Sequence, residues 1–485
     1  MTIRSRLTRW LALPALLIAG LTTPAQPAAA ATCDIACQLF TDTAAVTQQR
    51  PKPFASGIGG HAETSTIVWN NQYFLYYRTF VSPSGQECPI PQGIAYATSG
   101  DGGNTWTPAN GGRPIAALQT VQEGQSCDKN DGVRSTWIYS PDVIADGSRL
   151  VMVFEQRDHD PNGNGAGRPR SFHSVRWVTS TDGRTWSNST RLLAPGGVGA
   201  WDDEIGTPDI EKDGSTYVVT FHGHDSTNRI KQRRATVRMS SLVQDYGGAR
   251  SSWALAATPA WANYGIGMAD MTREADGYWY AILEAFSGAS GACGREDTRT
   301  AVGIARSTDA VNWTVRTSPL LYGRDNKSCG WDMPAWQRVG SVRGFITPDD
   351  PPERTELVRW NVMAKAAPVR VTDGTELGAN RYLDPGDRIS DGTARLVMQG
   401  DGNLVLYRKS DNFVFWASDT NGSGATRALM QYDGNLVLLR ANGTAVRGTA
   451  TDGRPGAVLR VSGPSVLIDA YGIDVWRRTS PARGM

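Results

Sequence analysis

Acidic residues open several similar segments of this chain, and their repetition is the first sign of possible chemistry. The segments 140–156, 207–223 and 268–286 each place an Asp before an apolar-alternating run, an Asp-Gly turn and a second such run. The segment 61–78 has the same shape without the leading Asp, and 329–346 has it with an altered turn. The pattern predicts five β-hairpin units at the spacing of propeller-like repeats.

The hairpin geometry predicts which acidic side chains meet. In an antiparallel hairpin the start of the first strand lies beside the end of the second. We therefore expect three neighbouring pairs, Asp142 with Glu155, Asp209 with His222, and Asp270 with Glu284. If the first strands all begin on one face around a central axis, an acidic ring surrounds one mouth, made of Glu63, Asp142, Asp209, Asp270 and Asp332.

An acidic ring suits glycoside hydrolysis, in which one acid protonates the leaving oxygen and a carboxylate activates water or attacks the anomeric carbon. Repulsion within the ring can hold one member protonated near neutral pH. The candidate catalytic residues are Glu63, Asp142, Asp209, Asp270 and Glu284. The alternative for each single Asp is that it caps a turn or bonds a backbone amide of the neighbouring sheet.

A second candidate site lies in "LVMQGDGNLVLY" (396–407). Every second residue of a strand faces the same side, so these side chains are expected to converge on one small ligand: Gln399, Asp401, Asn403, Val405 and Tyr407. Amides and a carboxylate suit the paired hydroxyls of a sugar, and the valine can pack against its C–H face. A turn alone needs Asp-Gly, but neither the glutamine before it nor the tyrosine after it.

The same motif returns about thirty residues later with changes. The second copy keeps four members but has Leu439 in place of the tyrosine, which predicts weaker binding at Gln431, Asp433, Asn435 and Val437. A third copy has lost the polar set, and we expect no site there. Residues 372–478 resemble the bulb-type mannose-binding lectins of monocots through Q-x-D-x-N-x-V-x-Y. The resemblance implies a β-prism of three four-stranded sheets that binds mannose at these positions.

Three short segments end with a tryptophan after an Asp: "SGDGGNTW" (99–106), "STDGRTW" (180–186) and "STDAVNW" (307–313). The Ser and Asp can bond backbone amides of a tight turn that the tryptophan covers, so we expect structural turns without a catalytic role. The first matches the Asp-box of sialidase-like propellers. With these turns and the hairpin layout, residues 55–365 resemble the five-bladed propeller glycosidases of the arabinanase, xylosidase and fructosidase type.

This second resemblance implies an Asp base in the first blade, a second Asp that tunes pKa, and a Glu acid. Glu63 stands where the family has its leading Asp, Asp209 matches the tuning Asp, and Glu284 is the candidate acid in a different local context. His222 and His224 share one side of a strand, and we interpret them as incidental surface histidines.

Composition limits the function classes. A chain of 485 residues suggests two or three domains. The 49 basic and 47 acidic side chains give a net charge of +2, which argues against nucleic acid as the main partner. The sequence has no CxxC pair and no HExxH, and its histidines are scattered, so we assign no metal ligands and no cofactor; a cation bound at the acidic mouth stays open.

Residues 1–31 have the arginines, apolar run and small residues of a secretory signal peptide, so a secreted protein without a membrane span is expected. The six cysteines then indicate disulfides. Fifteen pairings are possible, and we favour Cys33–Cys37, Cys88–Cys127 and Cys293–Cys329.

The expected fold is all-β, a five-bladed β-propeller followed by a β-prism. The expected function is hydrolysis of a polysaccharide, with the lectin unit for targeting. Two alternatives stay open: a non-catalytic sugar-binding protein with a scaffold propeller, and a sialidase-like enzyme that uses Arg78, Arg134 and Arg157.

Overall fold

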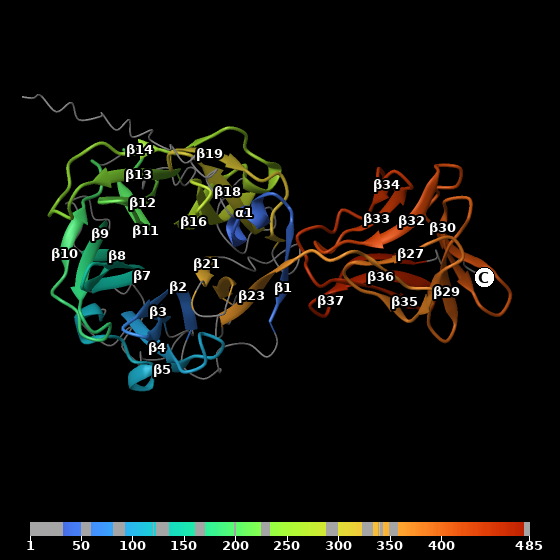
Figure 1. Ribbon diagram of the computed structural model, residues 1–485, viewed down its shortest axis with the longest axis horizontal. Helices are drawn as coiled ribbons and strands as arrows, with labels where there is room; N and C mark the ends of the chain where they lie inside the picture. The colour runs from blue at the N-terminus through green and yellow to red at the C-terminus, as the bar shows by residue number, and fades with distance from the viewer. Residues whose placement is uncertain are drawn as a thin grey trace, which may run out of the picture.

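The chain is almost entirely β-structure in the computed structural model (Figure 1). The structure describes residues 33–49, 60–80, 93–119, 121–122, 135–160, 170–197, 200–224, 233–287, 299–322, 333–337, 339, 343–348 and 357–479. Their strands form eight sheets that follow one another along the chain. Among the described residues, no helix is long and apolar enough to cross a membrane.

Five sheets come from the first 364 residues, and their strands have these bounds. The first has β2 (Gly60–Trp69), β3 (Gln72–Phe80), β4 (Gly93–Ser99) and β5 (Thr107–Pro108). The second has β6 (Val121–Gln122), β7 (Ser135–Asp146), β8 (Arg149–Asp160), β9 (Arg170–Ser180) and β10 (Thr190–Leu193). The third has β11 (Glu204–Asp213), β12 (Thr216–His224), β13 (Arg233–Met239) and β14 (Ser251–Ser252).

The fourth sheet has β15 (Ala254–Leu255), β16 (Gly265–Arg273), β17 (Trp279–Ser287), β18 (Arg299–Ser307), β19 (Asn312–Val315) and β20 (Leu321–Tyr322). The fifth has β21 (Ala335–Gln337), β22 (Gly344–Pro348), β23 (Leu357–Ala364) and β1 (Ala44–Gln48). Short 3-10 turns cover Ala109–Gly112, Ala116–Leu118 and Ala260–Ala262. Each of the five predicted units thus forms a hairpin, from β2–β3 to β21–β22.

The five sheets surround a common centre, with β2, β7, β11, β16 and β21 nearest to it (Figure 1). Neighbouring inner strands contact one another in this order, and β21 returns to contact β2. The N-terminal strand β1 closes the circle, since Ala44 to Gln48 pair antiparallel with Ala364 to Trp360 of β23. The two ends of this region are therefore held in one sheet.

The three tryptophan-terminated turns are structural, as predicted, and they also join neighbouring sheets. In the second turn, Thr185 N–H donates to Asp182 at 2.8 Å and Gly183 N–H donates to the Ser180 hydroxyl at 2.8 Å. Trp186 lies buried over the turn. The Tyr76 hydroxyl of the first sheet donates to the Gly183 carbonyl at 2.7 Å.

The other two turns make the same kind of link. Thr236 of the third sheet donates to the Ala310 carbonyl at 2.5 Å, and Gln337 of the fifth donates to the Gly103 carbonyl at 2.8 Å. The buried guanidinium of Arg359 also donates to Gly103. Because Gly103 belongs to the first sheet, this last link is a second closure of the circle.

Helix α1 (Ile35–Phe40) docks the N-terminus on the fourth sheet. Its first N–H groups, of Ala36 and Cys37, donate to the buried Glu274 carboxylate at 2.9 and 3.0 Å. Since helix N-termini carry unsatisfied donors, this acid caps α1. The predicted disulfide Cys33–Cys37 is present and confirmed. Cys88, Cys127, Cys293 and Cys329 lie outside the described residues.

Three further sheets follow residue 368. The first has β24 (Val369–Arg370), β27 (Arg381–Leu383), β32 (Ala425–Met430), β33 (Leu436–Arg440) and β34 (Ala445–Gly448). The second has β25 (Asp373–Gly374), β28 (Arg388–Ser390), β29 (Ala394–Met398), β30 (Leu404–Arg408) and β31 (Val414–Ala417). The third has β26 (Glu376–Leu377), β35 (Val458–Ser462), β36 (Ser465–Ala470) and β37 (Ile473–Thr479). All three contribute alternate apolar residues to one buried core.

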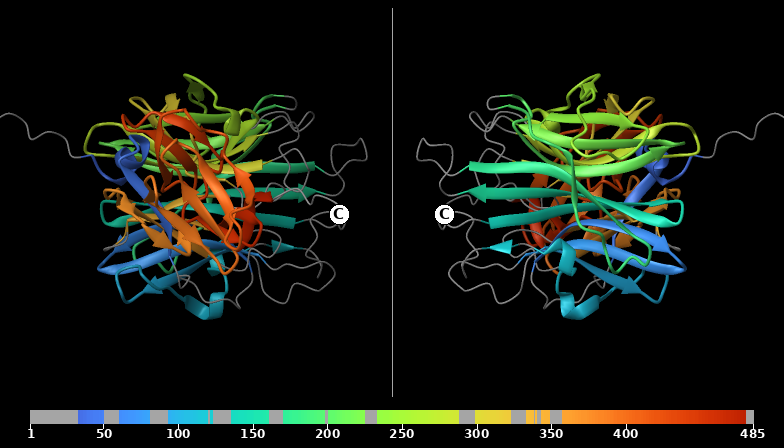
Figure 2. Two further views of the ribbon diagram at one scale, coloured as in Figure 1. Left: turned by 90° about the vertical axis from the view of Figure 1, so that its right-hand side faces the viewer. Right: turned by 90° about the vertical axis from the view of Figure 1, so that its left-hand side faces the viewer.

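The two regions lie against each other, with the C-terminal sheets beside the fourth and fifth sheets of the first region (Figures 1 and 2). Tyr322 N–H donates to the Gly453 carbonyl at 2.7 Å, and a Cβ on Gly453 would lie 2.5 Å from the Tyr322 ring. Trp360 meets Tyr471 edge-on with ring centroids 6.1 Å apart. These contacts fix which faces of the C-terminal region stay accessible.

Candidate functional site

A bulge near the start of each of four inner strands changes the predicted pairing of the acids. The register shifts after Ala62, Tyr139, Gly206 and Ile266. Three bulged residues have positive φ: Glu63 at 49°, Ser140 at 49° and Thr207 at 39°. A bulge adds an unpaired residue and bends the strand, so the side chains beyond it face different partners.

The three predicted cross-strand pairs are therefore wrong. Asp142 lies opposite Val153, Asp209 opposite Thr220 and Asp270 opposite Ile282. Glu155 lies instead opposite Tyr139, and His222 opposite Gly206. The physical reason is the bulge, because each Asp is the first or second paired residue after it and is displaced along the partner strand.

The three Asp carboxylates connect neighbouring inner strands. Asp142 accepts the Ile210 N–H at 2.7 Å, Asp209 the Met271 N–H at 2.9 Å, and Asp270 the Trp336 N–H at 2.7 Å. In the first unit, Ser65 takes this role and its hydroxyl accepts the Val143 N–H at 3.1 Å. The alternative weighed for single Asp residues, bonding to a neighbouring sheet's amide, thus describes all three.

The same acids surround the axis. A cavity of about 180 Å³ at the centre of the five sheets is lined by Asp142 and Asp270, together with other residues of the five inner strands: Ser65, Thr66, Val143, Ile144, Ile210, Glu211, Met271, Thr272 and Trp336. Asp209 is buried beside it, with 2% of its surface exposed. Asp332, the fifth member expected in the ring, lies outside the described residues.

Asp142 and Asp209 are buried carboxyl groups whose interaction favours a proton shared between them. Burial, together with repulsion from Asp142 and Asp270, raises the pKa of Asp209 well above its ordinary value. Burial also raises the pKa of Asp142, against hydrogen bonds from Ile210 and Ser65. The Asp209 Oδ2 atom meets no donor among the described residues. A protonated Asp209 that donates to Asp142 satisfies both groups.

A second group of charged side chains surrounds Tyr139, close to the starts of the inner strands. The buried Glu63 accepts the Ser140 N–H at 2.8 Å and pairs with Arg78 at 3.4 Å. The guanidinium carbons of Arg78 and Arg157 lie 3.9 and 4.6 Å from the centre of the Tyr139 ring. Two arginines considered for the sialidase-like alternative thus converge on one aromatic ring, while Arg134 lies outside the described residues.

Glu155 belongs to the same group of charged side chains and is fully buried. It accepts the Thr207 N–H at 3.0 Å and pairs with Arg157 and with His173, the latter at 3.3 Å. Burial raises the pKa of this carboxyl, but Arg157 and His173 outweigh it and hold the pKa well below its ordinary value. A Cβ on Gly206 would lie 2.2 Å from the Glu155 carboxylate, so only glycine leaves room for it.

The histidines interpreted as incidental belong to the same cluster. His222 is buried, its Nδ1 lies 2.7 Å from the Thr207 hydroxyl, and burial lowers its pKa to about 3. His224 Nε2 pairs with Glu204 at 2.5 Å. The His222 interpretation as a surface residue is therefore wrong. The signal missed in the sequence is Glu204, which lies opposite His224 on the neighbouring strand.

Glu284, the candidate acid, is 6% exposed and lies on the fourth sheet. Its carboxylate accepts the Met268 N–H at 3.2 Å. The neighbouring cation is the buried Arg234, which donates to the Gly267 carbonyl at 2.7 Å. Like Glu63, Glu284 satisfies a backbone amide at the bulge of an inner strand.

The polar motif of the C-terminal region forms a hairpin end rather than a continuous strand. Residues 399–403 connect β29 to β30, so only Val405 and Tyr407 lie on a strand. Two of the five predicted side chains meet, because the Gln399 amide donates to the Tyr407 hydroxyl at 2.6 Å.

The other members of this set have distinct environments. Asp401 is exposed, and its carboxylate accepts the Asn403 N–H at 2.9 Å. Asn403 Oδ1 accepts the Ser418 hydroxyl at 2.9 Å, while Val405 is buried. The polar groups are thus held in place with one carboxylate open to solvent.

The second motif copy has the same turn in a different environment. Asp433 accepts the Asn435 N–H at 2.9 Å, and Asn435 is held by Thr449 at 3.0 Å. The Asp433 carbonyl accepts the Arg454 N–H at 2.8 Å. Gln431 and Asp433 are half-buried and Val437 is buried, on the side that meets the first region. With Leu439 in the tyrosine's place, this copy lacks the hydroxyl bond seen in the first.

No protein-family model matches the sequence, and no curated protein does so either. Several solved structures resemble parts of the chain. A Polygonatum cyrtonema lectin complexed with monomannoside is 32% identical over 23% of this chain and 97% of its own, with a TM-score of 0.19. An N-acetylgalactosamine deacetylase from F. plautii is 13% identical over 66% of this chain and 94% of its own, with a TM-score of 0.44. A Bacillus subtilis arabinanase is 12% identical over 64% and 96%, with a TM-score of 0.39.

Proposed function

We propose that the protein is a secreted carbohydrate-active protein, in which a five-bladed β-propeller (55–365) carries a β-prism (372–478) that binds a sugar. The observation that carries the proposal is the bond between Gln399 and Tyr407 across the hairpin end. This bond brings an amide and a phenol together beside an exposed carboxylate, that of Asp401. A small number of convergent polar groups of this kind is enough to give a sugar site its orientation and specificity.

The chemistry of the hairpin end suits adjacent sugar hydroxyls. The exposed Asp401 accepts hydrogen bonds, Gln399 can donate and accept, and the Tyr407 hydroxyl can donate outward while it accepts from Gln399. A hydroxyl that fails to pair with these groups leaves them unsatisfied, which discriminates among sugars. The three-sheet arrangement leaves this end open, while the second copy faces the propeller.

The test is calorimetric titration of the full chain with methyl α-mannoside. Asp401→Asn removes the charged acceptor and is expected to weaken binding about tenfold. Asp433→Asn, the same change in the second copy, is the matched control and is expected to leave binding within about twofold. Equal losses in the two variants, or unchanged binding in Asp401→Asn, contradict the assignment.

A second candidate function is glycoside hydrolysis at the axial cavity, favoured by the Asp142–Asp209 pair. Enzymes that cleave glycosides need one carboxyl that keeps its proton and one that has lost it. The raised pKa of Asp209 supplies the first, and the half-buried Asp270 and Asp142 supply carboxylates at the cavity wall.

Released reducing sugar tests this candidate on arabinan, xylan, fructan and mannan. Asp209→Asn cannot supply a proton and is expected to lower release at least a hundredfold. Asp101→Asn, an exposed acid of the first tryptophan-terminated turn, is the control and should retain release. If the wild type releases nothing while it binds methyl α-mannoside, the protein is the non-catalytic sugar-binding alternative.

A further inference from the structure

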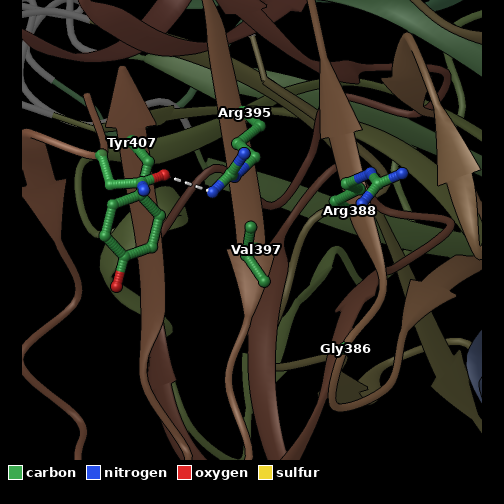
Figure 3. A pocket seen from close by; sticks show the side chains of 6 residues that line it. Gly386, Arg388, Arg395, Val397 and Tyr407 are labelled. Carbon is green, nitrogen blue, oxygen red and sulfur yellow. Dashed lines mark hydrogen bonds between the residues drawn. The ribbon is translucent and has the colours of Figure 1, made fainter. Parts of the chain in front are cut away.

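The face of the β25–β28–β29–β30–β31 sheet carries a second feature beside the hairpin end. A cavity of about 500 Å³ is lined by Gly386, Arg388, Arg395, Val397, Tyr407 and Asn412. Figure 3 shows Arg395 and Val397 on the middle strand, with Tyr407 on one side and Arg388 on the other. Tyr407 therefore belongs both to the proposed sugar site and to this cavity, which extends the site across three strands.

The two arginines of the cavity differ in their partners. Arg388 is paired with Asp373 at 2.5 Å. Arg395 donates to the neutral Asn412 Oδ1 at 2.5 Å, and its guanidinium carbon lies 5.8 Å from the centre of the Tyr407 ring. Within the described residues, Arg395 has no carboxylate partner. The lining contains cationic, aromatic and apolar groups but no acid.

In the neighbouring β24–β27–β32–β33–β34 sheet, the arginine at the equivalent position has a carboxylate partner. Arg427 lies opposite Leu439 as Arg395 lies opposite Tyr407. Arg427 is paired with Asp384 through two bonds, at 2.9 and 3.3 Å.

Asp384 follows Leu383, whose partner is Ala428, and this places it opposite Arg427. In the β25–β28–β29–β30–β31 sheet the corresponding position is Ser390, which lies opposite Arg395. The repeat therefore has an acid opposite Arg427 and a serine opposite Arg395. Among the described residues, the β25–β28–β29–β30–β31 sheet has no carboxylate partner for Arg395.

We propose that Arg395 is the counter-charge for an anionic group on the bound glycan, so that this site prefers an acidic sugar beside the residue held by Gln399 and Tyr407. The proposal rests on the sugar-binding function proposed above. Arginine presents a planar fork that bonds carboxylate or sulfate through two donors. Both a uronic acid and a sulfated sugar carry such a group, and the shared chemistry is an anion within reach of Tyr407.

The test compares three probes by calorimetric titration of the full chain: mannobiose, the same disaccharide with glucuronic acid at its non-reducing end, and mannobiose 6-sulfate. One of the two acidic probes is expected to bind about tenfold more tightly than mannobiose at low salt, and the ratio should fall as salt rises. A preference for the glucuronate identifies a carboxylate ligand, and one for the sulfate identifies a sulfated ligand. Both results support the proposal.

Two variants and one control separate this proposal from sugar binding itself. Ser390→Asp builds the acid that the neighbouring sheet has, and the affinity ratio of acidic to neutral probe should fall to about one. Arg395→Gln should lower the ratio in the same way, and it tests the proposal if Ser390→Asp does not fold. Arg427→Gln should leave the ratio as in the wild type.

Equal affinity of the wild type for neutral and acidic probes overturns the proposal, as does a ratio that survives both variants. Failure to bind any of the three probes overturns the sugar-binding function as well, so the two failures are distinguishable.

Discussion

The shared proton of Asp142 and Asp209 makes a specific prediction about stability. Asp209→Asn keeps the shape of the side chain, and its amide can donate permanently to Asp142 while its oxygen accepts the Met271 N–H. The variant therefore imitates the protonated acid at every pH. Its free energy of unfolding should lack the pH dependence that Asp209 contributes.

The sign and size follow from linkage. The pKa of Asp209 in the folded protein is raised, so its contribution is fully present below the unfolded pKa, about 3.9, and is lost as pH rises toward the folded value. Over that interval the free energy of unfolding of the wild type should fall by about 1.4 kcal/mol per pH unit relative to that of Asp209→Asn. Above the folded pKa the difference becomes constant.

Urea denaturation at half-unit steps from pH 4 to 8 measures this difference, since other titrating groups cancel between the two proteins. Asp101→Asn is the control with the opposite sign. Hydrogen bonds from Thr105 lower the pKa of Asp101 to about 2, so this variant should lose stability relative to the wild type above pH 4. Parallel pH profiles for the wild type and Asp209→Asn would refute the shared proton.

Three further predictions concern packing, binding and closure. Gly206→Ala places a Cβ 2.2 Å from the Glu155 carboxylate and should cost about 2–3 kcal/mol of unfolding free energy, whereas Gly197→Ala meets open space and should cost under about 1 kcal/mol, both measured by urea denaturation. Tyr407→Phe removes the hydroxyl that accepts from Gln399, and calorimetry with methyl α-mannoside should show about fivefold weaker binding. Deletion of β1 leaves the β23 edge unpaired and should lower the midpoint of thermal unfolding by more than about 5 °C; an unchanged midpoint would contradict the closure.

Local sequence patterns determined most elements of this fold. Alternation of apolar residues around Asp-Gly turns placed the five hairpins, because strand periodicity and turn chemistry act over a few residues. The tryptophan-terminated turns were predictable for the same reason, since Ser180 and Asp182 bond amides within their own loop. The convergence of Gln399 and Tyr407 also needed only a hairpin.

Tertiary structure decided the roles of the acids. A single bulged residue such as Thr207 moved Asp209 along its partner strand, and nothing in the local pattern of "GTPDI" marks that insertion. Whether Asp209 keeps a proton depends on Asp142 and Met271, which come from two neighbouring sheets. Likewise, Arg395 and its compensated counterpart have similar sequence contexts, and only the strand opposite each arginine shows which charge is left for a ligand.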